Sequence, residues 1–339
     1  MSGVLVTHAD EPIGRRIVKT LFHDERVGSV LALGDGPPPR SFDPYLSGTP
    51  PKVAYVQVDL ARHRPVADFF HSSRFRDAAV ETVVHVPRHG HGADDGLPVV
   101  SGLPVRTAEA RLVLQNALEV GTVGSLVALG SAFVYRFLPG NANRLRETSE
   151  INLDPSVDPD LRSWIDCDMI FHGEIGNECL RVVLLRIPTV VASGGFVYLN
   201  PSLAGPAGPR LRPLGFDPLC ALVSDKDVAK AVQCAVHANR AGVFNVAGQE
   251  CVPLSVLGRW TRRPSLPLPG PLLRALSGAA EAVGAARLRA SLDGAHLRYG
   301  FTLDTSRAER ELGFRSSYRI GLDRAGDGAL RLETSSTAV

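Results

Sequence analysis

The sequence has very little lysine: of its 37 basic residues only four are lysine, and the rest are arginine. Acidic residues number 35, so the formal net charge is only +2. A chain with this balance lacks the excess of one charge that binding to nucleic acid or to an anionic membrane requires. We therefore expect neither as a partner.

The chain also has no apolar run of the roughly 18–20 residues that are needed to cross a bilayer. Residues 1–12 lack the basic start, apolar stretch and small-residue cleavage site of a signal peptide. The five cysteines are widely spaced and form no C-x-x-C pair, which is typical of reduced thiols. Together these absences predict a cytoplasmic protein.

Short apolar runs alternate with helical patterns through the first 190 of the 339 residues. The helical patterns include residues 13–22 and 106–121, whose apolar positions recur at helical spacing. The expected strands, rich in Val and Leu without clean alternation, are residues 3–7, 28–33, 52–58, 80–86, 124–130 and 181–187. Strands of this kind are buried on both faces, as in a parallel sheet covered by helices. We predict an α/β fold with a Rossmann-like, doubly wound parallel sheet in residues 1–190.

The texture changes in the second half, where residues 191–324 predict a smaller C-terminal cap region that partly returns to the sheet. Within it we expect a strand and helix over 219–238, with Asp225 as N-cap, and a strand over 242–248. Gly- and Pro-rich residues predict a long loop over 194–218, a link over 264–271 and a flexible tail over 325–339.

Eight segments, in this order along almost the whole chain, resemble the extended short-chain dehydrogenases/reductases. The resemblance is to their NAD-dependent epimerase/dehydratase family, which includes UDP-glucose 4-epimerase. The segments are residues 4–18, 58–60, 82–86, 126–135, 182–190, 223–232, 242–248 and 303–314. The resemblance implies NAD or NADP on the N-terminal sheet and a nucleotide-sugar or another small molecule under the C-terminal part. It also implies a homodimer.

The family's first turn reads T-G-x-x-G-x-x-G, and residues 7–14 keep only Thr7 and the last glycine, Gly14. The lost glycines permit unusual backbone angles and a close approach to the pyrophosphate. His8 stands where a positive φ is needed, at a cost of about 1 kcal/mol. The Glu11 carboxylate, if ~4 Å from a phosphate charge, would repel it by about 4 kcal/mol at an effective dielectric of about 20, unless its side chain swings outward.

Other parts of a nucleotide site are retained. Asp35 lies 21 residues after Gly14, where an acidic residue holds the adenosine ribose, although Gly34 aligns equally well with that position. Asp35 is also consistent with an ordinary turn residue, and the resemblance places Asp59 beside the adenine. The cofactor-binding positions that the resemblance implies are Thr7, Glu11, Ile13, Gly14, Asp35, Asp59, Leu60 and Val86.

The family's catalytic pair, Tyr-x-x-x-Lys, is absent after all six tyrosines. The lysine of such a pair lowers the pKa of the tyrosine, so that the phenol exchanges a proton near neutral pH. In the segment that should carry the pair, residues 161–176, Trp164 takes the place of the tyrosine and Asp168 that of the lysine. Trp164 has no titratable proton, and a carboxylate raises the pKa of a neighbouring acid. Ser131 matches the catalytic serine, or is a structural hydroxyl.

Two other groups of residues are candidates for a replacement chemistry. Asp168 and His172 are four residues apart and share a helix face, so they form either an acid–base or metal pair or, with Glu174, a polar surface. A histidine cluster at 85, 89 and 91 does not match the spacing of a common zinc site, and we expect no metal. Asp227 is expected to be structural.

Three functions remain open. The first is a non-catalytic relative that keeps the fold and a nucleotide or nucleotide-sugar pocket, and that acts by binding or by regulating a protein partner. The second is an active NAD(P)-dependent epimerase, dehydratase or reductase with a rearranged site. The third is a structural scaffold that binds no small molecule. Fold alone does not choose between them.

Overall fold

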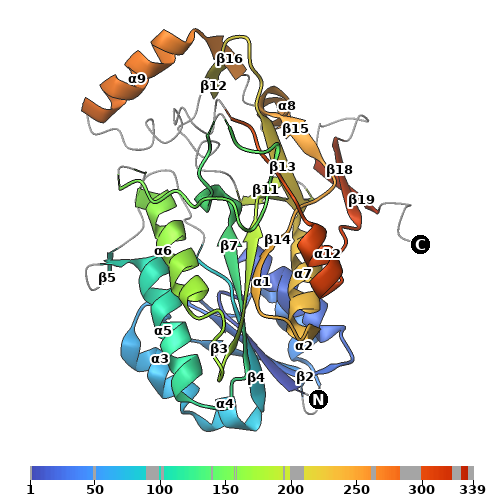
Figure 1. Ribbon diagram of the computed structural model, residues 1–339. Coiled ribbons are helices and arrows are strands. Elements are labelled where there is room, and N and C mark those ends of the chain that lie inside the picture. The colour runs from blue at the N-terminus through green and yellow to red at the C-terminus, as the bar shows by residue number, and fades with distance from the viewer. Residues whose placement is uncertain are drawn as a thin grey trace.

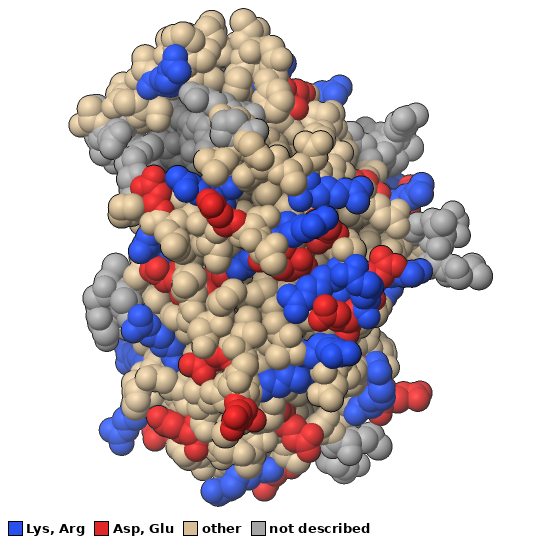
Figure 2. All heavy atoms as spheres, in the orientation of Figure 1, with Lys and Arg blue, Asp and Glu red and all other residues tan. Residues whose placement is uncertain are grey.

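The computed structural model describes most of the chain. The described residues are 2–48, 51–88, 99–100, 103–138, 140–155, 157, 159–193, 195–198, 210–260, 265–282, 299–322 and 330–334. No helix among them is long and apolar enough to cross a membrane. Over the face seen in Figure 2, basic and acidic side chains are interspersed, in keeping with the small net charge.

A seven-stranded sheet forms the centre of the molecule (Figure 1). Its strands are β1 (Ser2–Val6), β2 (Val27–Gly34), β3 (Val53–Gln57), β4 (Val80–His85), β7 (Ser125–Ser131), β9 (Arg181–Ile187) and β14 (Gly242–Asn245). Their order is β14-β9-β7-β4-β1-β2-β3, and every neighbouring pair is parallel. The predicted doubly wound α/β fold is confirmed.

Helices cover both faces of this sheet. One face carries α1 (Pro12–Phe22) and α7 (Asp225–His237), which pack against each other. The other carries α3 (His63–Phe70), α5 (Val105–Glu119) and α6 (Pro159–Gly173), on the opposite side of the sheet in Figure 1. Alternate residues of β1 feed two separate cores: Val4 and Val6 pack in one, and Leu5 packs in the other. Burial on both faces explains why these strands lack polar alternation.

A second sheet, of order β11-β10-β13-β15, lies above the first in Figure 1. Its strands are β10 (Thr189–Ala192), β11 (Gly195–Tyr198), β13 (Leu219–Ser224) and β15 (Cys251–Pro253). Two-stranded pairs join β12 (Arg210–Pro213) to β16 (Ser265–Leu268), β18 (Tyr318–Leu322) to β19 (Leu330–Thr334), β8 (Arg144–Leu145) to β17 (Thr302–Leu303), and β5 (Val99–Val100) to β6 (Leu103–Pro104). The remaining helices are η1 (Arg40–Phe42), α2 (Asp43–Leu46), α4 (Ser73–Asp77), η2 (Ala132–Val134), α8 (Leu254–Trp260), α9 (Gly270–Ala282) and α12 (Ser306–Leu312).

The C-terminal half differs from the expectation in four places. The predicted loop 194–218 contains β11 and β12, and the predicted link 264–271 contains β16 and the start of α9. Residues 330–334, placed by composition in a flexible tail, pair with β18 as β19. β12 and β16 pair with each other although they are remote in sequence, so local composition conceals both. β11 and β19 instead pair with the strands that directly precede them, β10 and β18. Asp225 is the first residue of α7, and the N-cap is Ser224, whose Oγ accepts from the Asp227 N–H at 2.9 Å.

Candidate functional site

The strand order places a switch in chain direction between β1 and β4. From β1 the chain moves to β2 and β3 on one side, and from β4 it moves to β7, β9 and β14 on the other. Open parallel sheets bind ligands in the crevice outside the carboxyl ends of the strands at such a switch point. The residues that follow β1, β2 and β4 therefore line the candidate crevice.

Thr7 follows β1 and lies at this switch point. Its Oγ1 accepts from the Val86 N–H at 2.9 Å and donates to the Val86 carbonyl at 3.1 Å, and it lies 3.2 Å from His85 Nδ1. All three residues are buried. Thr7 thus ties the end of β1 to the end of β4 across the switch point.

The turn from β1 to α1 is as tight as the expected glycine motif. His8 has φ +44°, the left-handed conformation that glycine adopts without strain, so the expected need for a positive φ at this position is confirmed. A Cβ on Gly14 would stand 2.1 Å from the His8 carbonyl oxygen, which leaves no room for any other residue there. Glu11, the N-cap residue of α1, is only 8% exposed and so does not swing out to solvent.

An ion network bridges the crevice from β2 to α5. His8 Nε2 lies 3.0 Å from Glu109 Oε2, and Arg88 donates to Glu109 Oε1 from Nε at 3.0 Å and from Nη2 at 2.8 Å. The same Nη2 donates to Asp35. Glu109 and Arg88 were missed at the sequence level, since a glutamate within a helix and an arginine beside a histidine-rich segment both resemble ordinary surface charges.

The network shifts the pKa values of its members in opposite directions. Burial alone would lower the pKa of His8, but the Glu109 carboxylate outweighs it and raises the pKa above its usual value. Burial likewise would raise the pKa of Glu109, and His8 and Arg88 lower it instead. Burial and the neighbouring His8 lower the pKa of His85 to about 3, so His85 is neutral. Its Nε2 has no hydrogen-bond partner among the described residues.

The other implied cofactor positions divide between core and surface. Ile13, Leu60 and Val86 are buried in the hydrophobic cores. Asp59 is exposed and pairs with Arg62 at 3.0 Å. The structure therefore gathers Thr7, Glu11, Gly14, Asp35 and Val86 near the switch point and leaves Asp59 at the surface.

Asp168, which the resemblance aligns with the family's catalytic lysine, belongs to a buried ion pair with Arg186. Asp168 accepts from Arg186 Nε at 2.8 Å and from Nη2 at 2.7 Å, and both side chains are fully buried. Asp168 also packs beside the end of β7, because its Oδ2 lies 3.7 Å from where a Cβ on Gly130 would stand. The Arg186 guanidinium is 4.8 Å from the ring centre of Tyr135. These contacts hold the Asp168 and Arg186 side chains in place.

Ser131 and Trp164 are also fixed by packing. Ser131 is buried, and its Oγ accepts from the Phe133 N–H at 3.2 Å as the N-cap of η2. Trp164 is 2% exposed and lies under the Arg106 guanidinium, 4.1 Å from its ring centre. These contacts hold both side chains in place.

The proposed Asp168–His172 pair is wrong, because both Asp168 oxygens bind Arg186 while His172 is exposed. For the same reason Asp168 is not part of a polar helix surface. Within the described residues no three His, Cys, Asp or Glu side chains are arranged to hold a metal ion. His89 and His91 lie outside those residues.

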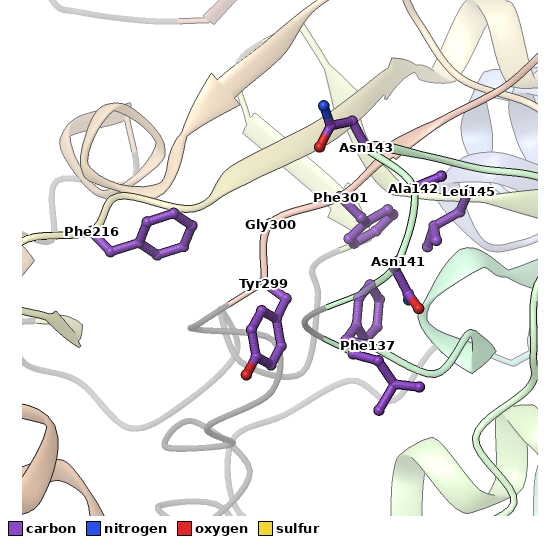
Figure 3. A pocket seen from close by; sticks show the side chains of 10 residues that line it. Phe137, Asn141, Ala142, Asn143, Leu145, Phe216, Tyr299, Gly300 and Phe301 are labelled. Atoms are coloured by element: carbon purple, nitrogen blue, oxygen red, sulfur yellow. The ribbon is translucent and has the colours of Figure 1, made fainter.

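Figure 3 shows a separate cavity of about 320 Å³. Four aromatic residues from three separate parts of the chain line it: Phe137, Phe216, Tyr299 and Phe301. The Phe137 and Phe301 rings pack with their centres 4.9 Å apart. Asn141 and Asn143 supply amide groups at its rim. Polar and apolar atoms contribute about equally to its lining, and small-molecule sites combine apolar walls with polar groups.

No protein-family model matches the chain. Uncharacterized proteins of Mycobacterium tuberculosis and Mycobacterium bovis are 30% identical to it over 139 residues, which is 41% of this chain. The match spans only 36% of those relatives' own length.

Solved structures match over nearly the whole length. A dTDP-glucose 4,6-dehydratase of Bacillus anthracis in complex with NAD has a TM-score of 0.63 at 12% identity, covering 94% of this chain and 92% of that one. A Streptomyces venezuelae dTDP-glucose 4,6-dehydratase with NAD bound has a TM-score of 0.63 at 19% identity, covering 96% and 94%. A Thermus thermophilus UDP-glucose 4-epimerase with NAD has 0.62 at 18%, covering 94% of each. The chain has the fold of the extended short-chain dehydrogenases/reductases, of the epimerase/dehydratase type.

Proposed function

We propose that this protein is a non-catalytic relative of the nucleotide-sugar epimerases and dehydratases, which binds a nucleotide or nucleotide-sugar, or regulates a partner, without transferring hydride. One observation carries the proposal: Asp168, which the resemblance aligns with the family's catalytic lysine, is fully buried and has both carboxylate oxygens bound to Arg186. A lysine there would act on a phenol, and Trp164 has none.

Tyr135, whose ring centre lies 4.8 Å from the Arg186 guanidinium, does not supply the missing base. Burial raises the pKa of Tyr135 to about 12, and its hydroxyl donates to Asn245 Oδ1 at 2.7 Å. A phenol with that pKa stays protonated at neutral pH and is a poor general base. This supports a site without the family's proton exchange.

The crevice also suits a dinucleotide poorly. Its carboxylates include Asp35, Glu11 and Glu109, and Arg88 is already shared between two of them. The Asp10 carboxylate lies there too and accepts from the Asp35 and Gly36 N–H groups. A pyrophosphate placed here would meet carboxylates in a partly desolvated setting, where charge repulsion is strong. We therefore expect weak or no binding of NAD or NADP.

The aromatic cavity is the part of the molecule that favours small-molecule binding. Phe216 is 45% exposed although it lines the cavity, and Figure 3 shows its ring separated from Tyr299 and Phe301. Aromatic walls stack against flat rings, and amides at the rim give direction to a ligand with polar edges. A nucleotide base has both properties.

Calorimetric titration with NAD⁺, NADH, NADP⁺, UDP and UDP-glucose tests the proposal, with Phe216→Ala as the cavity variant and Leu153→Ala, another exposed apolar side chain, as its control. We expect uridine nucleotides to bind the wild type, and Phe216→Ala alone to weaken that binding. Micromolar binding of a nicotinamide cofactor together with turnover of any nucleotide-sugar would refute the proposal.

An active enzyme with a rearranged site is the alternative. Ser131 at the end of β7 favours it, as do solved structures of this fold that contain NAD. An active enzyme should copurify with its cofactor, and the reduced form would appear by absorbance or fluorescence after denaturation. If neither cofactor nor nucleotide binds and pulldowns recover one stable protein partner, the chain is a scaffold.

A further inference from the structure

The Glu109 carboxylate lies between the His8 imidazole and the Arg88 guanidinium. Its Oε2 lies 3.0 Å from His8 Nε2, and its Oε1 accepts from two nitrogens of Arg88, at 3.0 and 2.8 Å. The side chain is fully buried, whereas that of Arg88 is 27% exposed. The carboxylate therefore sits behind Arg88, with solvent on the far side of the guanidinium.

The cations that hold Glu109 are those that proteins use to hold ligand oxyanions. A guanidinium presents parallel N–H donors to carboxylates and phosphates, and a protonated imidazole adds a charge-assisted hydrogen bond. His8 belongs to the turn after β1, and Arg88 follows β4, so the two cations flank the switch point of the sheet. This is where ligands of such sheets bind.

We propose that Glu109 is a built-in anion, which fills an oxyanion site formed by His8 and Arg88 and so closes the crevice to phosphate-bearing ligands. The inference rests on the proposed function, because a closed crevice is one that holds no dinucleotide. It goes further in assigning the closure to one carboxylate, whose removal leaves a site for a small oxyanion.

The Asp168–Arg186 pair and the ion pairs of Arg88 differ in their access to solvent. Asp168 and Arg186 are both fully buried, so a solute has no approach to that pair. In the crevice, Arg88 and Asp35 are 27% and 30% exposed. A small oxyanion can therefore reach the position of Glu109 once its side chain is shortened.

Replacement of the missing carboxylate by an added anion tests the proposal. The variants are Glu109→Ala and, as control on the same helix, Glu119→Ala, whose glutamate is exposed. Thermal unfolding is followed in sodium formate, acetate and phosphate, each against sodium chloride at equal ionic strength, because salts also stabilise proteins in general ways. Calorimetry then measures binding of inorganic pyrophosphate.

We expect Glu109→Ala to unfold at a lower temperature than the wild type and to be restored by formate, acetate or phosphate beyond the effect of chloride. Wild type and Glu119→Ala should show no such difference. Pyrophosphate should bind Glu109→Ala at least about tenfold more tightly than the wild type. If Glu109→Ala does not fold alone, its refolding yield in formate or phosphate should exceed that in chloride.

A folded Glu109→Ala that gains neither stability nor pyrophosphate binding overturns the inference, as does a refolding yield that no oxyanion improves. Both results leave the proposed function intact if the wild type still fails to bind NAD. Micromolar NAD binding by the wild type contradicts the closed crevice, and it contradicts the proposed function only if a nucleotide-sugar is also turned over.

Discussion

His8 combines a strained backbone conformation with a buried imidazole that contacts Glu109. The left-handed conformation costs a residue with a Cβ about 1 kcal/mol relative to glycine. The imidazole offsets this cost by its contact with Glu109 at 3.0 Å, which a glycine could not make. Compared with a glycine, a histidine at this position has less backbone freedom but makes an internal contact.

This pairing makes stability depend on pH. Because Glu109 raises the pKa of His8 above its ordinary 6.5, the folded state binds the proton more tightly than the unfolded state. The stabilisation is complete below pH 6.5 and is lost as the pH rises through the raised pKa. Urea unfolding of the wild type and His8→Gln between pH 5 and about 9 measures it. The stability advantage of the wild type should shrink with rising pH, and a constant difference would contradict the assigned pair.

Sequence reasoning at this scale found the residues that depart from a motif and missed those that compensate for the departure. Thr7, His8, Glu11 and Gly14 stood out against the expected glycine pattern. Glu109 is 101 residues from His8, and nothing in its local sequence distinguishes it from a solvated helix residue. The compensating contact exists only in three dimensions.

Among the elements, α7 anchors the C-terminal segment through its first turn. Ser224 caps the helix, and the Asp227 carboxylate accepts from Ser316 Oγ at 3.0 Å and from the Ser317 and Tyr318 N–H groups at 2.8 and 3.2 Å. The start of β18 is therefore fixed by a helix that packs on the main sheet. The expectation that Asp227 is structural agrees with these contacts.

Two variants separate the cap from the anchor. Ser224→Ala removes the capping hydroxyl and should cost about 1 kcal/mol of unfolding free energy. Asp227→Ala also leaves the Ser317 and Tyr318 N–H groups without acceptors, and should cost about 2–3 kcal/mol. Hydrogen exchange over Tyr318–Leu322 should accelerate in Asp227→Ala and change little in Ser224→Ala. Equal exchange in both variants would show that β18 is held in another way.

Elements were predictable where burial imposes a pattern. The strands of the main sheet are apolar because both faces are covered, so their runs were visible in the sequence. β16, in contrast, contains Pro267 and pairs with β12, some 50 residues away, in a two-stranded ribbon. Proline is tolerated in such an edge strand, yet its presence in a sequence points to a link.

At the scale of the whole molecule, the Asp168–Arg186 pair connects several elements of the fold. Arg186 of β9 binds Asp168 of α6 and lies over Tyr135, and the Tyr135 hydroxyl donates to Asn245 of β14. Burial would lower the pKa of Arg186, but the Asp168 carboxylate outweighs it and raises the pKa, so the guanidinium stays charged. A helix, two sheet strands and the segment after β7 thus meet at one charge pair.

This arrangement predicts that restoring the motif will not restore the reaction. Trp164→Tyr combined with Asp168→Lys recreates Tyr-x-x-x-Lys, but the new lysine faces Arg186, and the guanidinium loses its only carboxylate partner among the described contacts. Breaking a buried pair in this way costs about 3–5 kcal/mol. Urea unfolding should show that loss, and assays with NAD and UDP-glucose should show no turnover.

The pair itself can be separated from the motif by a double-mutant cycle. Asp168→Leu alone leaves Arg186 charged and buried, whereas Asp168→Leu with Arg186→Met replaces both partners by apolar side chains. The double variant should be close to the wild type in stability, and the single variant far below it, because the cost lies in the unpaired charge. Additive losses would mean that the two side chains act independently, and would contradict the assigned pair.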